Sequence, residues 1–508
     1  MTVNPKWTPM RWRCGPLGVA QPETPGKPVG SMRRGFQRAA EPWADPALLD
    51  LLDDTSINCL VVDWASGGKA DETQQWLLLP LIEAGRRKGI SFVGRVTAKE
   101  GLPAIASAGR AAGLEALLLP GPVSEPLDLP VIASFSRDSV DWDHLTDTFA
   151  VSGNPWPGGV LPRFYLQNQS SPQPASAHPE PAGPTMDPWV DSNGWVSLLA
   201  RSIAPGKTLW LEFPPKDPAM PLPAQQYCLA VADARASGCR WIIDLDEPTR
   251  AALAARAPEA TAAWKQIAAM NAFFDQHPQW AEGSSVGVLT VVSDFRDNAG
   301  MSNEVLNLLQ RQHVPFVVAD RGRPLAPSVT GKRAVLWVDD PEPTAEQHAL
   351  LMRFVAQGGL LIAPKYWGPK GVVSHQEDWL FGYDVYPVDK GRIVVATDGF
   401  ADPFQLDRDT HILVGHEHDP FRLFNPGLSN CFISSLPGTH KEIVHVLNYS
   451  APRPVDYLTL WIQRSALSAT LWSVADSKPL KCLAENGGTS FALPPVEVHY
   501  AVEIERQS

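Results

Sequence analysis

The sequence lacks the apolar segments of a membrane-spanning protein, since none of its hydrophobic runs approaches the roughly 20 residues that a transmembrane helix needs. Positive charge is also low: 43 lysines and arginines stand against 55 aspartates and glutamates, giving a formal charge of −12. Such a chain repels a phosphate backbone. We therefore expect neither a membrane nor a nucleic acid as partner, and the 44% of hydrophobic residues predicts a globular protein with a large core.

Motifs for cofactors and metals are missing as well. The six cysteines are spread over the chain without a C-x-x-C pair, which excludes a zinc knuckle and a dithiol redox motif. Neither a P-loop nor a dinucleotide-binding glycine pattern occurs. We expect no cofactor and no metal, and cysteines that are mostly buried thiols, although six would also permit disulfides.

The N-terminus lacks the charged-then-apolar order of a secretory signal. This favours a cytoplasmic protein. A secreted protein whose signal was trimmed would fit the same sequence.

From Met10 to about His277, short apolar runs alternate with amphipathic stretches, which is typical of βα units around a parallel sheet. Eight runs predict strands, at residues 10–14, 58–64, 90–96, 116–119, 131–135, 159–165, 208–213 and 239–245. Eight strands in this length predict a (β/α)8 barrel, a TIM barrel, over residues 1–280. The long irregular segments 15–41 and 167–188 are expected to be loops at the carboxyl ends of the strands.

Two further domains are predicted after the barrel. Strands at 286–292, 315–319, 334–338 and 359–363, with helices at 303–312 and 344–357, indicate a flavodoxin-like α/β domain over residues 281–380. From residue 381 to 508 the helical patterns fade. Alternating strands such as 392–396, 443–448 and 456–462 there indicate an all-β sandwich.

Two stretches relate this order of domains to a known family. Residues 354–362 (FVAQGGLLI) look like the helix, Gly-Gly and strand of an amidotransferase-like domain, and residues 445–449 (HVLNY) with 491–495 (FALPP) look like a final β-sandwich. The chain thereby resembles the family 42 β-galactosidases and related glycoside hydrolases over nearly its whole length. The resemblance implies hydrolysis of an O-glycosyl bond in a carbohydrate and a homo-oligomer, either a trimer or a dimer.

The chain departs from that family at one catalytic position. In those enzymes the nucleophile is a glutamate at the end of strand 7, and Glu212 in LWLEF (209–213) matches it. The acid/base is a glutamate in an Asn-Glu pair at the end of strand 4. Here strand 4 ends in LLLPGP (117–122), so the acid/base has no counterpart.

Glycoside hydrolysis needs two carboxyl groups at the carboxyl ends of the barrel strands. We predict Glu212, Asp246 and Asp63 as catalytic, with Asp244 and Glu247 contacting substrate, since crowded carboxylates raise the pKa of one of them, as a general acid requires. Two alternatives stay open. Asp246 begins a DEPT segment that is typical of a helix N-cap, and Asp63 could pair with an arginine.

Cationic and aromatic side chains complete the predicted site. Arg11 and Arg13 alternate with Trp12, so both would point into the barrel. The residues expected to contact substrate are Arg11, Arg13, Arg95, Arg137, Trp64 and Trp210. The tryptophans would offer flat faces to a sugar, and the arginines could grip an acidic sugar. Alternatively the arginines simply neutralise Asp63 or Glu212.

A weaker signal lies near the C-terminus. The segment HEHD (416–419) places two histidines where they could hold a metal, but no third ligand is evident, and we predict a surface loop.

The sequence thus predicts a glycoside hydrolase that acts on a carbohydrate at the carboxyl-end mouth of the barrel. A carbohydrate-binding protein that has lost its catalysis is one alternative. A scaffold protein that assembles through the α/β domain is another.

Overall fold

The computed structural model describes residues 3–18, 42–160, 189–339, 341–369, 371, 373–375, 382–400 and 402–507. Two compact units divide the chain: Met1–Pro157 with Gly206–Pro278, and Gly158–Pro205 with Gln279–Ser508. No disulfide joins the six cysteines. None of the described helices combines the length and apolar character needed to cross a membrane.

Eight parallel strands form the sheet of the first unit. Their bounds are β1 Pro9–Arg11, β2 Cys59–Ala65, β3 Ser91–Val96, β4 Ala116–Pro120, β5 Val131–Ser136, β6 Thr148–Ser152, β9 Thr208–Leu211 and β10 Arg240–Trp241. Each strand pairs with the next, and a parallel bridge between Met10 and Ile243 joins the last to the first. The predicted eight-stranded barrel is confirmed.

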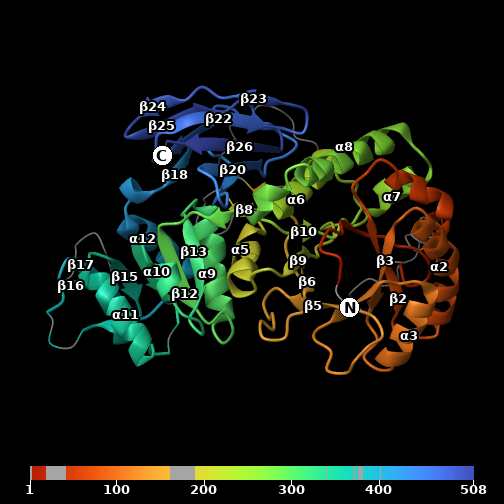
Figure 1. Cartoon of the computed structure of the whole chain (residues 1–508), viewed down its shortest axis with the longest axis horizontal. Helices are drawn as coiled ribbons and strands as arrows, with labels where there is room; N and C mark the ends of the chain where they lie inside the picture. The colour runs from red at the N-terminus through yellow and green to blue at the C-terminus, as the bar shows by residue number, and fades with distance from the viewer. Residues whose placement is uncertain are drawn as a thin grey trace. The chain divides into compact units, whose positions relative to one another are not determined.

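The helices among the described residues cover only part of this barrel. Helices α2 (Ala70–Arg87) and α3 (Leu102–Ala112) flank β2 and β3 on the outside (Figure 1), while α6 (Ala224–Ala236), α7 (Glu247–Ala254) and α8 (Pro258–Asp275) accompany the last two strands. Two 3₁₀ helices, Pro42–Ala44 and Pro46–Leu52, precede β2. The connections 121–130 and 137–147, both fully described, contain no helix.

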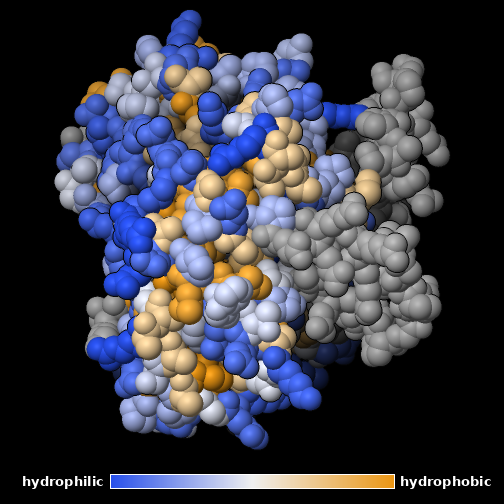
Figure 2. All heavy atoms as spheres, turned by 90° about the vertical axis from the view of Figure 1, so that its right-hand side faces the viewer, coloured by the Kyte–Doolittle hydropathy of each residue, from blue (hydrophilic) through white to orange (hydrophobic). Residues whose placement is uncertain are grey.

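Helix α2 shows why the covering helices form where they do. Its buried residues Gln74, Leu78, Leu81, Ile82 and Gly85 recur at helical spacing. A side chain at Gly85 would place a Cβ 2.5 Å from the ring of Phe92, so glycine lets the helix lie directly on β3. The opposite face of α2 is exposed and carries Trp76. Figure 2 views the molecule from this side and shows apolar residues gathered in a band between hydrophilic ones.

The sixth barrel strand is not the one predicted. Thr148–Ser152 takes that place, whereas Gly158–Val160 (β7) pairs with Trp189–Asp191 (β8) in a separate two-stranded sheet of the second unit. The predicted run 159–165 contains Pro162, which cannot donate a ladder hydrogen bond in a central strand. Residues 161–188 and 19–41, which hold most of both predicted loops, lie outside the described part of the chain.

The second unit contains a doubly wound sheet. Its order is β13 (Phe316–Asp320), β12 (Leu289–Ser293), β14 (Ala334–Trp337), β15 (Leu360–Ala363), β17 (Gly391–Ala396) and β16 (Tyr383–Val388), and only β16 is antiparallel. This is the predicted flavodoxin-like order. Helices α5 (Gly194–Ile203), α9 (Ala299–Arg311), α10 (Ala326–Val329) and α11 (Ala345–Ala356) pack around it.

Strand β17 corrects the prediction, because residues 392–396 were expected in the sandwich. They pair in parallel with β15 as a buried apolar run, so the α/β sheet continues to Ala396, beyond residue 380. Helix α12 (Pro403–Val414) follows where no helix was predicted. Asp402 caps its first turn and Pro403 begins it, a start signal that the sequence does contain.

Two stacked antiparallel sheets at the C-terminal end of the chain form the sandwich, drawn in blue in Figure 1. One contains β11 (Ser284–Ser285), β19 (Ser429–Ser435), β20 (Lys441–Asn448), β26 (His499–Arg506), β22 (Ala466–Trp472) and β23 (Ser477–Pro479). The other contains β18 (Phe421–Phe424), β21 (Thr459–Ile462), β25 (Gly488–Ala492) and β24 (Leu483–Glu485). Their inward side chains share one apolar core.

Candidate functional site

Apolar side chains fill the part of the barrel interior nearer the amino ends of the strands. They come from strands all round the ring and from the segment before β1: Val3, Trp7, Cys59, Val61, Val93, Ala116, Leu118, Ile132, Ala150, Trp210 and Ile242. The packing is a solid core, as in other barrels of this size.

A layer of charged side chains follows directly above this core. Residues two positions apart on a strand face the same way. Asp63, Arg95, Glu212 and Asp244 each follow a core residue at that spacing, so all four face the interior, one layer closer to the carboxyl ends of the strands. The carboxyl end is where barrels of this type carry their active sites.

Two arginines, one buried and one half-buried, hold two of these carboxylates. Arg11 donates a hydrogen bond to Asp63 Oδ1, and both side chains are almost fully buried. Burial lowers the pKa of Arg11, and the charge of Asp63 opposes this shift. Arg13 binds Asp244 with two donors, its Nε lying 2.9 Å from Oδ1. Burial alone would lower the pKa of Arg13, but the charge and hydrogen bond of Asp244 raise it above its usual value.

Glu212 is held more loosely. Its Oε1 lies 3.8 Å from Arg95 Nε, and Arg95 Nη1 lies 3.6 Å from Asp63 Oδ1, so one guanidinium stands between two carboxylates. The Glu212 side chain is 24% exposed, against 9% for Asp63. Among the described residues no hydrogen bond reaches the Glu212 carboxylate, which leaves it open to a ligand.

The contacts of Asp246 are structural. It is fully buried and caps α7, accepting hydrogen bonds from the Thr249 N–H at 2.7 Å, the Leu222 N–H at 3.0 Å and the Tyr227 hydroxyl at 2.6 Å. Burial and the nearby Asp246 charge raise the pKa of Tyr227. The capping interpretation therefore accounts for Asp246, and the predicted catalytic role does not fit these contacts.

Glu247 and Arg250 form a further buried pair beside the layer. Glu247 Oε2 accepts from Arg250 Nη2 at 2.5 Å, and Arg250 Nη1 donates to the carbonyl of Arg13 at 3.3 Å. Sequence reasoning missed Arg250. The signal that could have found it is its i,i+3 spacing from Glu247 at the start of a helix.

The tryptophans do not form the sugar platform that we predicted. Trp64 is buried on the outer face of the barrel, where its indole N–H donates to the Ile105 carbonyl of α3 at 3.3 Å. Trp210 lies in the interior core beside Trp7. Neither ring is open to a ligand in this structure. Arg137 follows β5 and lies 3.4 Å from the carboxylate of its neighbour Asp138.

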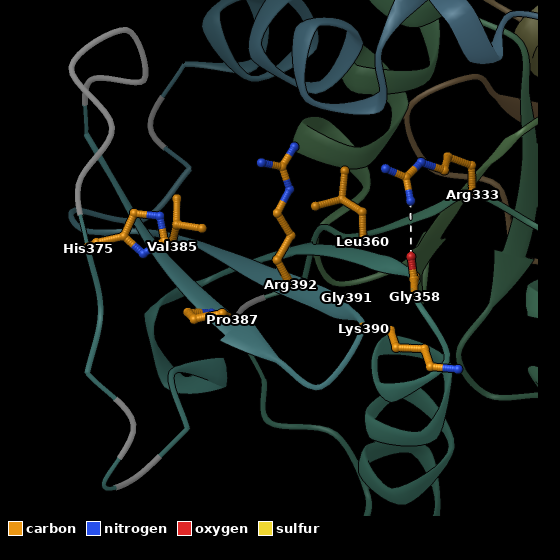
Figure 3. A pocket seen from close by; sticks show the side chains of 10 residues that line it. Arg333, Gly358, Leu360, His375, Val385, Pro387, Lys390, Gly391 and Arg392 are labelled. Carbon is orange, nitrogen blue, oxygen red and sulfur yellow. Dashed lines mark hydrogen bonds between the residues drawn. The ribbon is translucent and has the colours of Figure 1, made fainter.

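A cavity of about 300 Å³ lies in the second unit, at the amino ends of β14, β15 and β17 (Figure 3). Arg333, Lys390 and Arg392 line it, and Arg333 Nη1 donates to the Gly358 carbonyl at 3.0 Å. Ligands of doubly wound sheets bind at the carboxyl ends of the strands instead. The lining contains none of the predicted site residues.

No family model and no curated protein matches the sequence. Among solved structures, α-L-fucosidase isoenzyme 2 from Paenibacillus thiaminolyticus is similar, with a TM-score of 0.58 and 10% identity, covering 92% of this chain and 96% of that one. A catalytic mutant of a GH42 β-galactosidase from G. stearothermophilus is similar with a TM-score of 0.50 and 10% identity, covering 91% and 95%. The chain has a GH42-like glycoside hydrolase fold. The fold expected from its sequence motifs is thereby confirmed.

Proposed function

We propose that the protein is a glycoside hydrolase that acts on a carbohydrate at the carboxyl end of its barrel, with Glu212 as nucleophile or general base. The observation that carries the proposal is the contrast within the charged layer. Asp63 and Asp244 are hydrogen-bonded by arginines, whereas Glu212 is partly exposed and accepts no hydrogen bond from the described residues. Its place just after β9, the seventh barrel strand, agrees with this role.

Asp63 is the partner carboxyl group in this proposal. The carboxylates of Asp63 and Glu212 both lie within about 4 Å of the Arg95 guanidinium, so they are less than about 10 Å apart. The two catalytic carboxyl groups of glycosidases are separated by roughly 5 to 9.5 Å, which falls within this limit. Asp63 Oδ2 is buried without a hydrogen-bond partner among the described residues. A substrate hydroxyl that reached this oxygen after the neighbouring side chains rearranged would complete its hydrogen bonding.

A carbohydrate-binding protein without catalysis is the second candidate. The observation in its favour is the end of β4, where residues 119–122 provide no carboxylate at the position of the family's acid/base. In that case the charged layer would position a sugar through hydrogen bonds, and Glu212 would act only as an acceptor.

A panel of aryl glycosides and the matching free sugars separates the two candidates. The parent protein, Glu212→Gln and the control Glu83→Gln, whose side chain on α2 is 69% exposed, are assayed for release of the aryl group and, by calorimetry, for sugar binding. The glycosidase proposal expects turnover by the parent and the control, and a loss of ~10²-fold or more in Glu212→Gln with binding kept. Binding without turnover in the parent supports the second candidate. Turnover that Glu212→Gln retains overturns the assignment of Glu212.

A further inference from the structure

A cluster of potential metal ligands lies at the end of α12 in the second unit. His411 belongs to the last turn of that helix, His416 to the short 3₁₀ helix His416–His418, and Asp419 precedes β18. Gly415 has a φ of 85° and lets the chain reverse between the two histidines. One ligand atom from each residue lies within 4.8 Å of the others. His411 is the third ligand that the sequence did not reveal.

The spacing of the polar atoms suits a metal ion. His411 Nε2 lies 3.4 Å from Asp419 Oδ1, and His416 Nδ1 lies 3.3 Å from Asp419 Oδ2. In a tetrahedral zinc site with bonds of about 2.0 to 2.2 Å, ligand atoms are separated by roughly 3.4 Å. The two imidazole rings have centroids 4.2 Å apart, and each places one nitrogen near an oxygen of the same carboxylate.

Two of these atoms lack the partners that buried polar groups require. His411 Nε2 and Asp419 Oδ1 are buried, and neither forms a hydrogen bond with any described residue. The Asp419 side chain is only 5% exposed. Leaving such groups unsatisfied destabilises the folded protein, and one cation between them would satisfy both. His416, at 63% exposed, leaves a path to solvent for the ion and for a water ligand.

We propose that His411, His416 and Asp419 bind one Zn²⁺ ion, with water as the fourth ligand. Two imidazoles and one carboxylate suit zinc or a similar transition metal better than Mg²⁺ or Ca²⁺, which prefer all-oxygen sites. The ion would tie the end of α12 to the start of the sandwich. Arg422 Nε lies 3.4 Å from Asp419 Oδ2 and shares that carboxylate, which makes the site weaker than one without a neighbouring cation.

Zinc binding by the full-length, tag-free protein tests the proposal. After removal of metal with a chelator, Zn²⁺ is titrated calorimetrically, and Co²⁺ is used as a visible probe of tetrahedral coordination. We expect one equivalent of Zn²⁺ and a higher melting temperature. His416→Ala and Asp419→Asn should weaken binding by ~10-fold to 100-fold or more.

The matched control is His418→Ala, because His418 Nε2 faces Glu417, at 3.6 Å, and not the cluster. It should bind Zn²⁺ like the parent. His416 is exposed, so its replacement tests binding without endangering the fold. The proposal is overturned if the parent binds no Zn²⁺, or if His416→Ala and Asp419→Asn bind it as tightly as His418→Ala does.

Discussion

Replacing Asp63 by alanine would leave the guanidinium of Arg11 buried in the barrel without its hydrogen-bonded carboxylate. Arg11 Nε and Nη1 already lack hydrogen-bond partners among the described residues, so only the weaker charge interaction with Glu212 would remain to offset the loss. Removing one partner of a buried ion pair costs about 3 to 5 kcal/mol. Arg11→Met should cost less, about 1 to 3 kcal/mol, because Asp63 keeps Arg95 at 3.6 Å.

The double variant Arg11→Met with Asp63→Ala removes both charges and should be more stable than Asp63→Ala alone. Urea unfolding, followed by tryptophan fluorescence, gives the free energies. Asp138→Ala is the control in the same unit, since Asp138 is 75% exposed, and should stay within about 0.5 kcal/mol of the parent. A loss below about 1 kcal/mol for Asp63→Ala would refute the buried-pair reasoning, as would a double variant that is less stable than either single one.

Three further results are expected. Asp246→Ala should lower the free energy of unfolding by about 2 to 4 kcal/mol, because it removes the cap of α7 and leaves the buried Tyr227 hydroxyl without its acceptor. Thermal melting measures this loss. An unchanged melting temperature would contradict the capping role. Gly194→Ala should destabilise the second unit by about 1 to 3 kcal/mol, since a Cβ there would lie 2.1 Å from the ring of Phe432. A urea titration that shows no loss of unfolding free energy would contradict this packing. Burial raises the pKa of Asp407 to about 8, although the charges of Arg311 and Arg408 oppose this shift. Between about pH 4 and about pH 8 the folded state therefore keeps a proton that the unfolded state has released. The free energy of unfolding should fall as the pH rises through this range. Asp407→Asn should flatten this dependence in urea titrations at several pH values, and a slope equal to the parent's would contradict it.

Alternation along the strands accounts for the direction of more of these side chains than any motif does. Strand β9 places Glu212 two residues beyond a core tryptophan, so its inward direction could be predicted. The same rule shows why Trp64 could not belong to the site: it is adjacent to Asp63 on β2, and neighbours on a strand face opposite sides.

Contacts between distant segments could not be predicted in this way. Which carboxylate each arginine binds depends on the register and tilt of neighbouring strands, and the sequence left Asp63 and Glu212 equally open to Arg11. His411 joins His416 and Asp419 only because the chain turns at Gly415. The five-residue strand β6 lies between polar residues and gives too short a hydrophobic pattern to compete with the run at 159–165.

Chemical rescue tests most directly whether the Glu212 carboxylate stands at the reaction centre. With the aryl glycoside that the parent hydrolyses best, Glu212→Ala should lose ~10²-fold or more of kcat/KM while its melting temperature stays near that of the parent. Added azide, which can occupy the space left by the carboxylate, should restore turnover and yield a glycosyl azide. A Glu212→Ala protein that hydrolyses the substrate at the parent's rate, or that stays folded and inactive without any response to azide, would contradict the account.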